Sequence, residues 1–149
     1  MGSRVTERDM GWNAIKREVD AMNGKSVTVG LHEEDAGGGD PNNVEKGYHN
    51  EFGTANAPAR PFLRSTHDEK KMDWIRRMMT DFGQVLEQKK TGQQMLQSVG
   101  QFASKDVRQA VIEWDTPANA PSTIRRKGFD DPLIETGEMR DAIDYKVRG

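Results

Sequence analysis

The chain has 149 residues, a formal net charge of −2 and no cysteine, with 34% hydrophobic and 31% charged residues. This length predicts a single domain over residues 1–149, and the low apolar content predicts a thin core of the kind that an oligomer completes. The charge balance argues against a general nucleic-acid binder, and the lack of cysteine excludes disulfides and thiolate metal sites. Because the sequence has no long apolar run and no signal-peptide core, we expect a soluble protein of a reducing cytoplasm without membrane contact.

The first third of the sequence predicts a helix, a strand and a loop. Apolar residues at spacings of three and four predict a helix over residues 12–22, and Thr6 with Asp9 resembles the capping box that would begin it. Residues 25–32 alternate between apolar and polar and predict a short, half-buried strand. Residues 33–43 are rich in acids and glycine, a composition that predicts a mobile loop.

The middle of the sequence is mostly helical in pattern. Asn43 is the expected cap of a short helix over residues 44–52. Glycine and proline then fix a rigid, non-helical path through residues 54–61. Residues 62–114 carry apolar side chains at helical spacing and predict a long helical region with a break near residues 90–92.

The remaining elements complete an α+β pattern. Thr91 and Gln94 form a possible capping box at the break, so both two helices and one kinked helix fit the sequence. Residues 115–131 predict an extended arm or mobile loop, residues 136–143 a brief helix, and residues 145–148 a closing strand. We therefore expect a small, mainly antiparallel sheet packed with an N-terminal helix and a long helical pair, with projecting loops.

One group of acids and imidazoles is the best candidate for metal chemistry. Residues 32–35 (His-Glu-Glu-Asp), with Asp40, His49 and Glu51, include the oxygen and nitrogen donors that divalent cations use. Their spacing matches no zinc or EF-hand pattern, so we interpret the run as a solvated acidic loop. A nuclease would need converging ligands and a base near the attacking water, and only His49 and Glu51 lie close in sequence. We predict no catalytic, cofactor-binding or metal-binding residue and no enzyme activity.

Two segments are candidates for contact between subunits. In residues 60–64 two arginines bracket an apolar pair. Either the apolar pair packs in the core and only the arginines contact a neighbouring subunit, or the apolar pair is part of that intersubunit contact. Residues 125–127 are the densest basic patch, and they fit a solvated loop, pairing with an acidic face of a neighbour, or contact with DNA phosphates. Trp74 fits either a core anchor or an interface aromatic. The predicted interface residues are Arg60, Phe62, Leu63, Arg64, Arg125, Arg126 and Lys127.

Two blocks of the sequence resemble a known family. Residues 49–54 (His-Asn-Glu-Phe-Gly-Thr) and 58–64 (Pro-Ala-Arg-Pro-Phe-Leu-Arg) are similar to a signature of small virion-assembly proteins of tailed bacteriophages. Residues 119–128 and 132–140 (Pro-Leu-Ile-Glu-Thr-Gly-Glu-Met-Arg) resemble a segment near the C-terminus of the same proteins. These are the neck, head–tail joining and tail-completion proteins, including virion-morphogenesis proteins of Mu-like phages.

The resemblance implies a structural role without chemistry. It implies a virion protein at the head–tail junction that forms a homo-oligomeric ring, six- or twelve-fold, and contacts other neck, connector and tail proteins. DNA would pass nearby without specific binding, and the protein would occupy the host cytoplasm during assembly. The alternatives from other classes are a metal-dependent phage nuclease and a DNA-binding accessory module.

Overall fold

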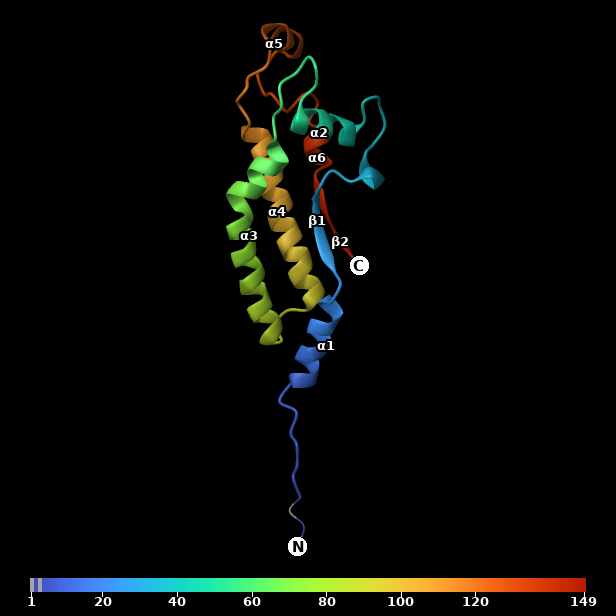
Figure 1. The fold of residues 1–149 in the computed structure, drawn as a ribbon, viewed down its shortest axis with the longest axis vertical. Helices are drawn as coiled ribbons and strands as arrows, with labels where there is room; N and C mark the ends of the chain where they lie inside the picture. Colours follow the sequence, from blue (N-terminus) through green and yellow to red (C-terminus); the bar gives the residue numbers. More distant parts are fainter. Residues whose placement is uncertain (1, 3) are drawn as a thin grey trace.

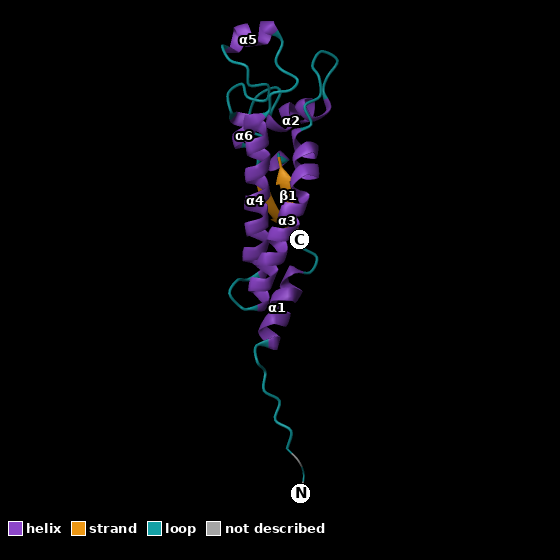
Figure 2. Cartoon of the chain, turned by 90° about the vertical axis from the view of Figure 1, so that its left-hand side faces the viewer, coloured by secondary structure: helices purple, strands orange, loops and turns teal. Residues whose placement is uncertain are grey.

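A pair of long helices forms the body of the molecule. The computed structural model describes residue 2 and residues 4–149 and shows a mixed α+β fold (Figures 1 and 2). The described residues form six α-helices and a two-stranded antiparallel sheet, which packs against the helical pair α3 (Phe62–Leu86) and α4 (Gly92–Glu113). The expected α+β class, with an N-terminal helix, a long helical pair and an antiparallel sheet, is confirmed.

The helical region divides into two helices because local side chains end one and begin the next. The Thr91 side chain accepts from the Gln94 amide at 3.1 Å, and the Gln94 side chain accepts from the Thr91 amide at 2.9 Å, so the predicted capping box is present. Trp74 is half-buried, and its Nε1 donates to Asp106 Oδ2 at 2.7 Å across the pair. Trp74 is therefore a packing anchor between α3 and α4.

A buried carboxylate fixes the lower end of the pair. Asp81 is 2% exposed, and its oxygens accept from Lys90 Nζ at 2.7 Å and from Arg77 Nε at 3.2 Å. Burial acts to raise the pKa of Asp81, but hydrogen bonds from Lys90, Ser98 and Arg77 outweigh it, and the pKa lies below its usual value. The charged group thus holds the end of α3 to the turn that starts α4.

The sheet lies on α4 with its apolar face inward. Strand β1 (Ser26–Gly30) pairs with β2 (Asp144–Arg148) so that Val27 faces Val147 and Val29 faces Tyr145. The predicted alternation of residues 25–32 places these side chains toward the helix. Gly100 of α4 makes room for the sheet, since a Cβ there would lie 2.3 Å from Tyr145 Cδ2.

The core is divided into two clusters along α4. The upper cluster gathers α3, α4 and the C-terminal segment: Phe62, Val107, Val111, Leu133, Met139 and Ile143. The lower cluster is smaller: Val85, Met95 and Leu96, with Met22 and Val27 packed against it. No helix of the described residues has the length and apolar character to cross a membrane.

The first helix, α1 (Trp12–Met22), begins differently from the expectation. Its N-cap is Gly11, with φ 97°, and the predicted Thr6–Asp9 capping box is wrong. Asp9 instead lies two residues before the cap, where Oδ1 accepts from the Gly11 amide at 3.0 Å and the Asn13 amide at 3.4 Å. A short acceptor can therefore satisfy the free amides of a helix from more than one position.

The predicted loops contain short helices. Within residues 33–43 lies a 3₁₀ turn, η1 (Glu33–Asp35), and α2 (Asn43–Phe52) is capped by Asn42 rather than by Asn43. The expectation of an arm or loop throughout residues 115–131 is wrong, because α5 (Pro121–Lys127) occupies its centre. Proline in the first turn and Gly128 just past the last turn, at φ 85°, are the local causes. The short helix α6 (Glu138–Asp141) precedes β2.

Candidate interface at the α2–α3 junction

Glu51 is the centre of the junction between α2 and α3. It lies in the last turn of α2 and is 4% exposed. Its carboxylate accepts from the amides of Leu63 at 2.9 Å and Arg64 at 3.1 Å, which are free amides in the first turn of α3. The negative carboxylate is also attracted to the positive N-terminal end of the helix dipole. Because the N-cap residue Pro61 makes no side-chain hydrogen bond, Glu51 acts as the cap of α3.

Arg64, in the first turn of α3, binds Glu51 of α2 with its side chain. Its Nε donates to Glu51 Oε1 at 2.8 Å and its Nη2 donates to the Glu51 carbonyl at 2.9 Å. The side chain of Arg64 is nevertheless 59% exposed, because it covers the carboxylate from outside. The pair Glu51–Arg64 therefore fixes the angle between α2 and α3 while one face of the guanidinium stays at the surface.

A tight turn connects the two helices. Gly53 ends α2 at φ 76°, and a Cβ there would lie 2.8 Å from the amide nitrogen of Ala59. Thr54 and Ala57 pair as an isolated antiparallel bridge, with the Thr54 amide donating to the Ala57 carbonyl at 2.9 Å. The Arg60 amide then donates to the carbonyl of Asn50, so the turn is tied to α2 at both ends. The non-helical path expected for residues 54–61 is confirmed.

Arg60 faces inward. It is 7% exposed, its Nε donates to the Pro117 carbonyl at 2.9 Å, and its Nη2 donates to the Ala118 carbonyl at 3.1 Å. Burial lowers the pKa of Arg60, against an opposing effect of Asp130. The guanidinium thus holds the segment after α4 against the α2–α3 turn.

Phe62 and Leu63 enter the fold rather than the surface. Phe62 is fully buried in the upper core, where Leu133 and Met139 belong to the same cluster. Leu63 is partly buried against this cluster. Of the two interpretations of residues 60–64, the structure supports the one in which the apolar pair packs in the core.

An exposed aromatic patch covers the junction. Tyr48 and Phe52 of α2 are 62% and 56% exposed, and their ring centroids lie 4.8 Å apart. The Arg64 guanidinium lies over the Phe52 ring at 5.0 Å. Tyrosine, phenylalanine and arginine are enriched in protein interfaces. Sequence reasoning missed Tyr48 and Phe52 because their spacing alone does not tell which side of α2 they occupy.

The basic triplet is split by its own contacts. Arg126 forms an ion pair with Glu135, and Lys127 Nζ donates to the Asp131 carbonyl at 2.7 Å. Lys127 also lies 4.9 Å from the centroid of the Phe129 ring, and burial lowers its pKa. Two of the three cations therefore order the segment after α5, and Arg125 is the most available of the triplet to a partner.

The acidic run does not converge into a metal site. Glu34 pairs with Arg148 Nη2 at 2.6 Å, and Asp35 pairs with Lys146 Nζ at 2.6 Å, so these acids hold η1 to β2. Hydrogen bonding to its own backbone amide and to Arg148 lowers the pKa of Glu34 to about 2. In the part of the chain that the structure describes, no three His, Asp or Glu side chains gather as a metal-binding group.

Comparisons with models of protein families, with curated proteins and with solved structures find no match for this chain. The site is therefore interpreted from its own geometry. The junction brings Arg60, Phe62, Leu63 and Arg64 together, while residues 125–127 lie on a separate helix. Arg60, Phe62 and Leu63 are committed to the interior of this chain. That the exposed Arg64 and residues 125–127 contact a neighbouring subunit stays a prediction, and Tyr48 with Phe52 extends it.

Proposed function

We propose that the chain is a structural virion protein of a tailed bacteriophage, placed at the head–tail junction as a neck or tail-completion ring. The proposal starts from the resemblance of residues 49–64 and 119–140 to such proteins. In this role the protein joins surfaces and transfers no chemical group.

One observation supports the proposal above all others: the two blocks of resemblance, distant in sequence, form one unit in space. Phe62 of the first block and Leu133 and Met139 of the second share the upper core. Lys46 of α2 pairs with Glu138 of α6 at 3.4 Å, and Asn50 Nδ2 lies 3.6 Å from Met139 Sδ. A signature made of two separated segments has a physical reason when both segments build the same end of the molecule.

The surface chemistry of this end also suits a binding role. Glu51 is committed to capping α3 and Arg60 to backbone carbonyls, so these two polar residues of the first block position the fold. The outer surface of this end carries the aromatic patch of Tyr48, Phe52 and the Arg64 guanidinium. Aromatic rings beside an arginine form the kind of surface on which a few residues carry most of the binding energy.

The experiment that tests this role is electron microscopy of a phage that encodes the chain with a stop codon at Trp74. We expect filled heads and separate tails that are not joined. Joined, normal virions would refute the junction role. EDTA-sensitive DNA cleavage that Glu51→Ala abolishes while the variant stays folded would favour the nuclease. A steeply salt-dependent DNA affinity lost on neutralising residues 125–127 would favour the DNA-binding module.

A further inference from the structure

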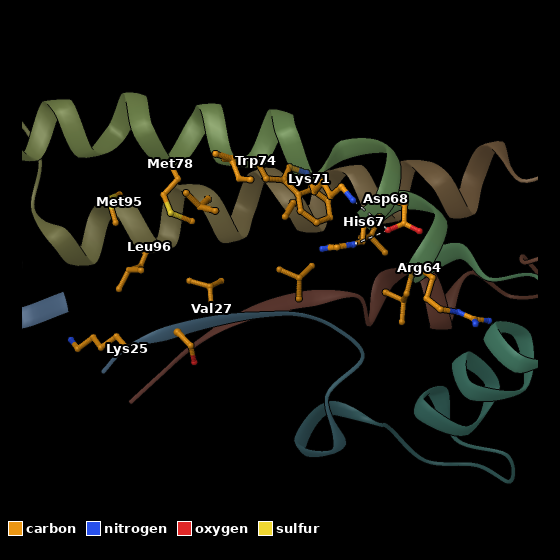
Figure 3. Close-up of a pocket in the computed structure, with 17 residues that line it drawn as sticks. Lys25, Val27, Arg64, His67, Asp68, Lys71, Trp74, Met78, Met95 and Leu96 are labelled. Carbon is orange, nitrogen blue, oxygen red and sulfur yellow. Dashed lines mark hydrogen bonds and ion pairs between the residues drawn. The ribbon is translucent and has the colours of Figure 1, made fainter. Parts of the chain in front are cut away.

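An apolar trough runs along the body between α3 and β1, with α4 as its floor (Figure 3). Its volume is about 950 Å³. Leu96 of α4, Val27 of β1, and Ile75 and Met78 of α3 contribute to its lining. Ile75 and Met78 remain 45% and 43% exposed, since no side chain of the described residues fills the space between them and β1. Exposed apolar concavities of this size are typical of binding sites.

At the N-terminal end of the molecule, exposed apolar side chains have no partner among the described residues. Residues 4–11, the N-terminal arm, extend away from the body beyond α1 (Figure 1). Val5, Met10 and Trp12 are 85%, 79% and 68% exposed. With Met79 of α3, at 69%, they are the four most exposed large hydrophobic residues of the described chain. Tryptophan and methionine are enriched at interfaces, and a tryptophan that fills a pocket is a frequent hot spot.

The arm and the trough of one copy lie apart in the structure. Met22, at the C-terminal end of α1, packs beside Met95 and Leu96 at the lower end of the trough. The 11 residues of α1 then lead away from the trough, over about 16 Å at 1.5 Å per residue. Trp12 therefore lies a full helix length beyond the trough of its own chain, and a second copy is the occupant that brings the two features together.

We propose that the N-terminal arm and Trp12 of one copy dock in the trough of the next. Fully extended, the eight residues of the arm reach about 26 Å, whereas the five residues of β1 along the trough span about 17 Å. The arm is thus long enough to follow the whole wall. Because the contact uses two different surfaces, it is heterologous and can continue from copy to copy until a ring closes. This contact deepens the proposed function and rests on it for the ring.

The competing occupant is the same helix of a second copy. Met72, Met79 and Leu86 on the outer side of α3 are also exposed, and they would support an isologous pairing of two α3 helices. Such a pair stops at a dimer and leaves Trp12 exposed. The two arrangements therefore differ in which substitution breaks them and in what a mixture of variants forms.

The test measures self-association of the full chain by sedimentation velocity, at concentrations up to about 1 mM, the range in which a single weak contact becomes populated. The arm variant is Trp12→Glu, the trough variant is Met78→Glu, and the matched control is Met79→Glu, adjacent on α3 but outside the trough. We expect the first two to weaken association at least tenfold and the control to leave it unchanged. All three positions are well exposed, so unchanged circular dichroism melting curves show that each variant is folded.

A mixture of the arm variant and the trough variant decides the geometry. The arm variant keeps an intact trough, and the trough variant keeps an intact arm. We therefore expect the arm of the trough variant to dock in the trough of the arm variant, which gives a one-to-one mixed dimer that grows no further. A monomeric wild-type chain at the highest concentration, loss of association with Met79→Glu alone, or a mixture that remains monomeric would each overturn the proposal. Sedimentation measures self-association, whereas electron microscopy of the phage measures head–tail joining. The proposed contact between copies can therefore be refuted while the junction role stands, and the junction role can be refuted while the contact stands.

Discussion

Replacing Glu51 by alanine is the most direct test of how the α2–α3 junction is held. The carboxylate is 4% exposed and accepts from two amides of the first turn of α3 and from the Arg64 side chain. Glu51→Ala removes all three acceptor contacts at once. The amides of Leu63 and Arg64 then lose their acceptor.

The expected loss follows from these contacts. Loss of a helix N-terminal acceptor costs about 0.5–2 kcal/mol. The ion pair with Arg64 adds at most about 1 kcal/mol, because the arginine is 59% exposed and solvent screens it. We therefore expect Glu51→Ala to lower the free energy of unfolding by about 2 kcal/mol, a fall in Tm of about 6 °C for a chain of this size.

Urea denaturation followed by circular dichroism measures this loss, and Glu45→Ala is the matched control. Glu45 is also a glutamate of α2 and accepts from the Asn42 amide at 2.8 Å, but it belongs to an exposed capping box. We expect the control to lower the free energy of unfolding by less than about 1 kcal/mol. Glu51→Gln keeps an acceptor without the charge, so we expect its loss of stability to lie between those of the two alanine variants. A loss for Glu51→Ala no larger than that of the control would refute the capping role of the buried carboxylate.

Three further predictions concern the fold. Arg60→Ala should lower the free energy of unfolding by about 1–3 kcal/mol in urea, because two backbone carbonyls lose a buried donor. Gly100→Ala should destabilise by about 1–3 kcal/mol, as its Cβ would overlap Tyr145, while Gly83→Ala, with nothing near its Cβ, should stabilise α3 slightly in the same assay. Glu34 has its pKa lowered from 4.5 to about 2, so its contribution to stability is present above about pH 4.5 and disappears toward pH 2. The wild type and Glu34→Gln should therefore differ above that range and converge below it.

Features set by neighbours in sequence could be predicted from the sequence. The capping box of Thr91 and Gln94 depends on residues three apart, and it is present as expected. The alternation of residues 25–32 places one face of β1 on α4. Both depend on residues close in sequence. Spacing alone is not sufficient, because Thr6 and Asp9 are also three apart and form no capping box.

Features set by distant residues could not be predicted. The interior position of Arg60 depends on the carbonyls of Pro117 and Ala118, more than fifty residues away, and an arginine beside a proline gives no sign of burial. The helix α5 is a different case, because its signals were present. Proline at its start and Gly128 at its end mark a short helix, but the polar composition around them favoured a loop.

The two arginines of one motif have separate roles, and this affects how an interface at the junction can be probed. Charge reversal at Arg60 removes a buried support of the segment after α4, so a failure to assemble would follow from loss of the fold. Reversal at Arg64 sets a carboxylate against Glu51 and has the same weakness. Tyr48 is 62% exposed, and its ring lies beside those of Phe52 and His49, with centroids 4.8 and 6.3 Å away, so its substitution disturbs the fold less than that of either arginine. Arg64 belongs both to the aromatic patch and to the lining of the trough, so Tyr48 and Phe52, which line only the patch, are the positions that probe it separately from the trough.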